Sequence, residues 1–89
     1  MRLKTGFVIR EIAGEKMILM RAGNTTDMTK AVMFNSTSEF LWNSLQVNDF
    51  DENDVKDLLT GKYDVEPEVA MADALRWITS MHNAGLIEN

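Results

Sequence analysis

Apolar positions near the start of the chain come in short runs rather than at helical spacing. Residues 7–12 and 17–20 are rich in β-branched and bulky side chains, which is typical of strands. Gly14 lies between these runs, and glycine as the first residue of a two-residue loop predicts a type II′ hairpin turn. A polar stretch at 23–27 follows, and then the uncharged run at 31–34 predicts a third strand. The pattern favours a three-stranded antiparallel meander.

The pattern then changes to helix signals. Ser36 followed by Glu39 has the spacing of a capping box, with an apolar stripe behind it. Asp51 marks a second start, and that helix is expected to stop at Gly61. A third helix is expected to begin at Glu66-Pro67, because proline suits the first helical position.

The third helix is expected to end at Gly85, with Leu86 packing back on Met81 as in a Schellman motif. The resulting order is three strands followed by three helices, and it predicts one α+β domain over residues 1–89. Helices two and three are joined only by residues 62–65, as in a helix-turn-helix. With the preceding sheet, the pair predicts a winged-helix-like domain.

Composition narrows the possible functions. The net charge is −5; residues 1–50 carry six Lys or Arg against five Asp or Glu, whereas residues 51–89 carry three against nine. There is no cysteine, which excludes disulfides and thiolate sites, and no apolar run is long enough to span a bilayer. The first residues lack the apolar stretch of a signal peptide, so we expect a cytoplasmic protein without membrane contact.

The sequence also lacks the usual signs of an enzyme. It has no glycine-rich phosphate loop, no paired catalytic carboxylates and no metal-ligand spacing. His82 is the only histidine, with no nucleophile signature beside it. We therefore expect no catalytic residue, no cofactor and no metal site.

Several segments together resemble the PqqD-like family. Residues 34–45 match the pattern in which an apolar residue and Asn end the third strand and a capped helix with a Leu-Trp pair begins. Residues 63–65, the pair Trp77-Ile78 and residues 81–87 are similar to the family's last helix and its closing apolar-Gly-Leu pattern. Residues 3–12 also resemble the N-terminal segment of this family. Residues 46–50 depart from the pattern, since the family usually has Asp-Gly and a Thr-led helix start there.

The resemblance implies a non-catalytic adaptor that binds the leader segment of a ribosomally made precursor peptide. The adaptor presents this peptide to a modifying enzyme, which in pyrroloquinoline quinone biosynthesis is a radical S-adenosylmethionine (SAM) protein. The leader is expected to add as an extra strand beside the third strand and to pack on the third helix, a form of β-augmentation. The expected strand contacts are Ala31, Val32, Met33 and Phe34.

The third helix has an apolar face wider than a small core needs. Its centre, at Ala74, Ile78 and Met81, is expected to be core, and Trp77 is expected to join it. Met71, Leu75 and His82 lie on one rim, and they are the expected peptide contacts on this helix. A plain core role for Met71 and Leu75, and a surface role for His82, are the alternative interpretations.

Two other functions fit the predicted fold. A DNA-binding winged helix would need several Lys or Arg on its recognition helix, but residues 66–84 carry three acidic residues against one arginine. We therefore expect no nucleic-acid partner. The other alternative is a purely dimerising structural protein, because an undefended edge strand can also pair with a second copy of the chain.

Overall fold

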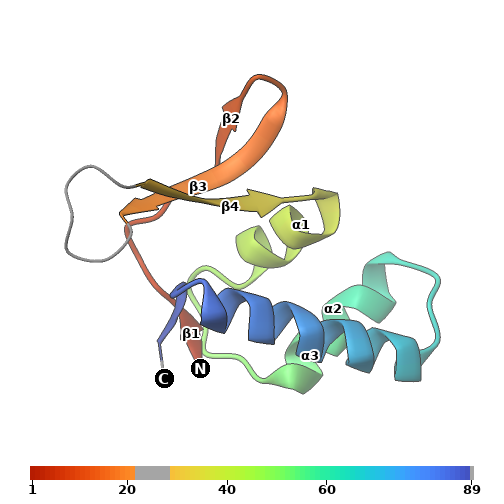
Figure 1. Ribbon diagram of the computed structural model, residues 1–89. Coiled ribbons are helices and arrows are strands. Elements are labelled where there is room, and N and C mark those ends of the chain that lie inside the picture. Colours follow the sequence, from red (N-terminus) through yellow and green to blue (C-terminus); the bar gives the residue numbers. More distant parts are fainter. Residues whose placement is uncertain (22–28, 89) are drawn as a thin grey trace.

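The computed structural model describes residues 1–21 and 29–88, and it confirms the predicted fold class. A three-stranded antiparallel sheet in the order β2-β3-β4 is followed by three helices, which lie on one side of it (Figure 1). The elements are β1 (Arg2–Leu3), β2 (Arg10–Ile12), β3 (Glu15–Arg21), β4 (Thr29–Phe34), α1 (Ser36–Ser44), α2 (Glu52–Lys62), α3 (Pro67–Asn83) and β5 (Ile87–Glu88). The first predicted strand is therefore shorter than expected, and the polar stretch at 23–27 lies outside the described residues.

The hairpin turn between β2 and β3 differs from the prediction. Ile12 pairs with Glu15, so the two loop residues are Ala13 and Gly14. Their φ angles are 54° and 82°, and two positive values define a type I′ turn, not type II′. Gly14 is thus the second loop residue, and Ala13 takes a left-handed conformation in which its Cβ is crowded.

The first helix also begins differently from the prediction. Its N-cap is Asn35, whose side chain accepts a hydrogen bond from the Ser38 N–H at 2.8 Å, so Ser36 is the first helical residue. Glu39 makes no capping box. It accepts two hydrogen bonds from the Lys16 ammonium group, at 2.8 and 2.9 Å, and so ties α1 to β3.

The boundaries of the other two helices are mostly as predicted. Asp51 caps α2 through a reciprocal capping box, although the helix runs past Gly61 to Lys62. Glu66 and Pro67 begin α3 as expected.

The end of α3 confirms the predicted Schellman motif. Gly85 has a φ of 83°, its N–H donates to the His82 carbonyl, and the Leu86 N–H donates to the Met81 carbonyl.

The core lies between the covered face of the sheet and the helices. Trp42 is 1% exposed and meets the ring of Phe34 edge-on, with 5.7 Å between ring centroids. Trp42 therefore holds α1 on β4. The core comprises Leu3, Ile18, Phe34, Leu41, Trp42, Leu45, Phe50, Val55, Leu59, Ala70, Ala74, Trp77, Met81, Leu86 and Ile87. Ile78 is only half-buried and packs at the edge of this cluster.

A second, two-stranded sheet was not predicted. β1 pairs with β5, so that Leu3 lies opposite Ile87 and both are buried. Beside this sheet the Arg2 guanidinium donates to both carboxylate oxygens of Asp49, at 3.0 and 3.2 Å. This contact holds the pKa of Asp49 below its ordinary value, through the hydrogen bond first and the charge of Arg2 second. The pairing fastens the α1–α2 loop to the N-terminal strand.

Candidate functional site: the free edge of β4

Backbone groups at one edge of the large sheet have no strand partner among the described residues, because β4 pairs only with β3. The two-residue turn makes the first pair of the β2–β3 ladder a hydrogen-bonded one, and such pairs alternate with non-bonded pairs along antiparallel strands. Glu15 and Met17 therefore direct their backbone groups toward β2, and the alternate residues Lys16 and Ile18 direct theirs toward β4. Phe34 and Val32, which lie opposite Lys16 and Ile18, are thus in hydrogen-bonded pairs with β3. The N–H and C=O groups of Ala31 and Met33 therefore point away from β3, toward the free edge.

The four predicted strand residues alternate between two environments. The side chains of Val32 and Phe34 point to the helical side, where Phe34 is 6% exposed and Val32 is half-buried. Ala31 and Met33 point to the opposite face, and both are exposed. The edge thus offers two outward-facing backbone positions, with apolar side chains on either face of the sheet.

A recess lies where β4 ends and α1 begins, across from α3. It has a volume of about 380 Å³. Its lining includes apolar side chains, contributed by Leu41, Leu59 and Trp77. The polar lining consists of Asn35, Thr37, Ser38, Asp73, Arg76 and Ser80. Trp77 is 8% exposed, and its buried indole N–H has no acceptor in the described part of the chain. This mixture of apolar and polar groups is typical of a pocket in which a few polar groups orient an apolar ligand.

The structure does not bring the three predicted helix residues to this recess. At about 100° per residue, Leu75 lies about 160° around the helix from Asp73 and Trp77, which line the recess. Met71 and His82 share the flank of Leu75. Leu75 is 50% exposed, His82 is exposed and Met71 is half-buried. Sequence periodicity located both flanks of the apolar face but could not show which flank turns toward β4.

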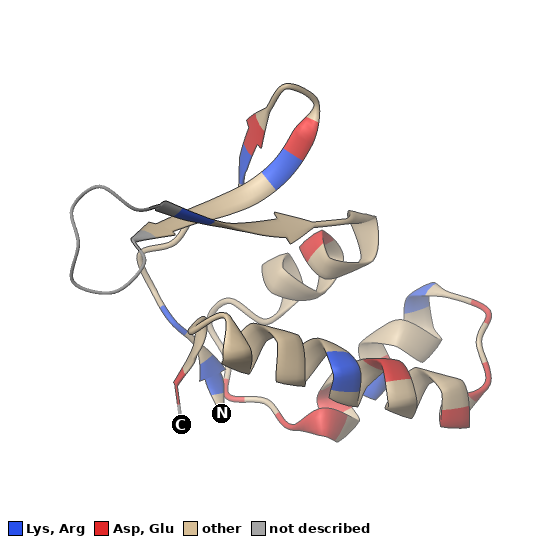
Figure 2. Cartoon of the chain, viewed as in Figure 1, with Lys and Arg blue, Asp and Glu red and all other residues tan. Residues whose placement is uncertain are grey.

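Charges around the site are few and mostly paired. Arg76 donates to Asp73 at 2.9 Å on the flank of α3 that lines the recess. At the other end of β4, the Lys30 ammonium group donates to the Ala84 carbonyl at 3.1 Å, which links the strand to the end of α3. Figure 2 shows most acidic residues on and around α2 and at the start of α3, away from the sheet. The edge of β4 is therefore a largely uncharged surface.

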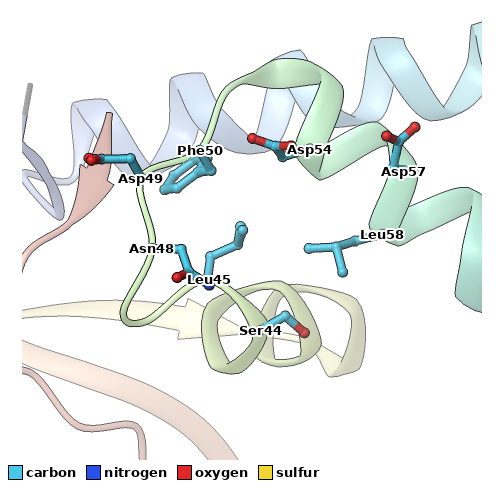
Figure 3. Close-up of a pocket in the computed structure, with 8 residues that line it drawn as sticks. All are labelled: Ser44, Leu45, Asn48, Asp49, Phe50, Asp54, Asp57 and Leu58. Carbon is cyan, nitrogen blue, oxygen red and sulfur yellow. The ribbon is translucent and has the colours of Figure 1, made fainter.

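A larger pocket lies elsewhere, between the end of α1 and α2, and has a volume of about 530 Å³ (Figure 3). Three carboxylates line it, from Asp49, Asp54 and Asp57. All three already have partners, because Asp49 binds Arg2, Asp54 accepts the N–H of Asp51 in the capping box, and Asp57 lies 3.5 Å from the Lys56 ammonium group. Across residues 1–21 and 29–88, no group of His, Asp and Glu side chains is arranged to hold a metal ion.

None of the described helices combines the length and apolar character that a bilayer span requires.

Comparison with known proteins identifies one family. Residues 15–87 match the family model described as "Coenzyme PQQ synthesis protein D (PqqD)", which covers β3, β4 and all three helices. No curated protein and no solved structure matches the chain significantly.

Proposed function

The chain belongs to the PqqD family, and from this premise we propose that it captures the leader segment of a ribosomally made precursor peptide and presents it to a modifying enzyme. Membership supports a peptide-binding accessory role related to PQQ biosynthesis. The proposal adds the mode of capture, which is pairing with the edge of β4, and a partner enzyme of the radical SAM type.

The observation that carries this proposal is the edge itself. Proteins usually protect an exposed edge strand with charge, proline or a bulge. Residues 31–34 of β4 are Ala-Val-Met-Phe and contain none of these, while the N–H and C=O groups of Ala31 and Met33 face outward. An extended peptide would pair with these groups, and its backbone hydrogen bonds would supply affinity for any sequence.

Selectivity would come from side chains beside the edge. Peptide residues opposite Val32 and Phe34 point to the helical side, because directly opposed residues of a sheet share a face. We expect one of them to enter the recess lined by Trp77, whose indole N–H has no acceptor among the described residues. We expect this peptide residue to be apolar, since Leu41, Leu59 and Trp77 contribute the apolar lining.

A proline substitution tests strand pairing directly. Ala31→Pro removes an outward N–H while keeping the hydrogen bonds between β4 and β3, and edge strands tolerate proline. We expect a roughly tenfold loss of affinity for a synthetic leader of the precursor encoded beside the chain, since one lost hydrogen bond and a displaced strand each weaken pairing. The measurement is an NMR titration, with thermal unfolding as the control for folding.

The same titration of the wild-type chain tests the site as a whole. Shifts at residues 31–34 and along α3 support the proposal, whereas shifts confined to α1 and α2, or none with the cognate leader, contradict it. Val32→Pro is a poor probe, because its N–H faces β3 and the substitution would damage the fold itself.

A matched pair of substitutions distinguishes the two flanks of α3. Ser80→Asp places a charge in the recess, and Leu75→Asp places one on the flank predicted from the sequence together with Met71 and His82. Weaker binding only in Ser80→Asp would assign the recess to the peptide. Weaker binding only in Leu75→Asp would support the prediction for Met71, Leu75 and His82.

A second candidate function follows from the same free edge, since two copies of the chain could pair through β4 and form a continuous sheet. Such a dimer would hide Ala31 and Met33, so the leader peptide should dissociate it. DNA binding has no comparable support, because α3 and its N-cap carry Glu66, Glu68 and Asp73 against Arg76 alone.

A further inference from the structure

The face of the large sheet that points away from the helices is apolar and exposed. Cross-strand pairing places five apolar residues on it, because opposed residues share a face and residues two apart along a strand do too. These residues are Ile12, Met17, Leu19, Ala31 and Met33, and we call this surface the open face. Ile12, Leu19 and Met33 are 44%, 41% and 50% exposed.

The charges on the open face lie at its margin. Arg10 is opposite Met17 near one end, and Glu15 is opposite Ile12 at the turn. Neither forms an ion pair with another described residue. An apolar centre with charged residues at its edge is the usual composition of a protein–protein contact surface.

The size of the open face limits what can occupy it. The strands lie about 4.8 Å apart and have three, seven and six residues, so at about 3.3 Å per residue they cover roughly 250 Å². A stable interface buries about 800 Å² per partner. The open face alone is therefore too small for a permanent dimer and is suited to a partner that binds and leaves.

We propose that the open face is the docking surface for the modifying enzyme and that the captured peptide strand becomes part of it. This inference rests on the proposed function. A strand added to β4 extends the sheet from three strands to four, and so enlarges the open face by about a third. The enzyme partner is expected to present a matching apolar patch, and it binds the loaded adaptor more tightly than the empty one.

Because side chains alternate along a strand, the two faces of the captured peptide contact different partners. Peptide residues paired with Ala31 and Met33 place their side chains on the open face, next to Ala31 and Met33 and separated by β4 from Leu19 and Met17. The intervening residues point toward α3 and the recess. Alternate residues of one segment are thus used for selection by the adaptor and for contact with the enzyme.

The test uses two lysine substitutions on the open face and one elsewhere. Leu19→Lys and Ile12→Lys change residues that lie away from the β4 edge, on β3 and β2. Val47→Lys is the matched control, because Val47 is 87% exposed in the α1–α2 loop. Affinity for the synthetic leader is measured by NMR titration. Affinity of the leader-loaded adaptor for the purified peptide-modifying enzyme of the same gene cluster is measured by calorimetry.

We expect all three variants to bind the leader within twofold of the wild-type chain. Leu19→Lys and Ile12→Lys should each weaken enzyme binding at least tenfold, and Val47→Lys should not. Unchanged enzyme binding with normal leader binding would overturn this inference and leave the proposed function intact. If the wild-type chain does not bind the leader, both fail. A wild-type dimer in sedimentation experiments that Leu19→Lys dissociates would assign the open face to a second copy instead.

Discussion

The two sheets of this molecule differ in how completely they bury their apolar side chains. In the small β1–β5 sheet, Leu3 and Ile87 are 2% and 6% exposed. In the large sheet, Ile12, Leu19 and Met33 remain 41–50% exposed on the open face. Full burial of an apolar side chain stabilises the fold by about 1.5–3 kcal/mol, so this partial exposure forgoes roughly half of that gain. The small sheet buries its apolar side chains, whereas the large sheet buries those of its covered face and keeps an edge and a face available for contacts.

We expect the largest loss of stability from a substitution where α1 packs on the covered face of the large sheet. Trp42→Ala removes the ring that packs on Phe34 and leaves a cavity between α1 and β4. We expect a loss of about 3–5 kcal/mol, as for other buried aromatic truncations. Urea unfolding measures it, and Trp42→Phe should cost less. A loss below about 1 kcal/mol would mean that α1 is held on the sheet by other contacts.

The same change, leucine to alanine, made once in each sheet tests the difference in burial directly. Leu3→Ala in the small sheet should lower the free energy of unfolding by about 2–5 kcal/mol, because Leu3 is fully buried. Leu19→Ala on the open face should change it by about 0.5 kcal/mol, which is usual for exposed positions. Similar losses in the two variants would show that Leu19 is buried in solution, for example by a second copy of the chain.

We expect the smallest effect on stability from loss of the ion pair beside the small sheet. Arg2 lowers the pKa of Asp49, so the contact stabilises the folded state at neutral pH. This stabilisation is lost as the pH falls through the lowered pKa, because the carboxylate is then protonated. Asp49→Asn should reduce the melting temperature slightly at pH 7 and not at all in stronger acid. An equal reduction in acid would point to packing rather than charge.

Local signals in the sequence were enough to predict most element boundaries. The helix start at Asp51, the proline at position 67 and the Schellman motif at Gly85 each depend on residues within one helical turn, and the structure confirms all three. The start of α1 was shifted by one residue, because Asn35 and Ser36 are both good N-caps and only the structure selects Asn35. The hairpin type was wrong because Ala13 rarely adopts positive φ.

Features that depend on distant residues could not be predicted. Two-residue strands carry no periodicity, so nothing in the sequence indicated that Leu3 would pair with Ile87. The same limit applies to the candidate site. The uncharged run at 31–34 marked a strand edge correctly. The recess beside Trp77, however, depends on how α1 and α3 pack together, and the helix residues predicted from periodicity lie on the other flank.

Pairing of β1 with β5 also bears on the order of folding. The hairpin of β2 and β3 closes a loop of two residues, whereas the contact between Leu3 and Ile87 closes one that contains nearly the whole chain. The entropy lost in closing a loop grows with its length, so this contact becomes favourable only after the helices and the large sheet have shortened the distance between the ends. The small sheet is therefore a late contribution to the folded state and cannot act as its nucleus.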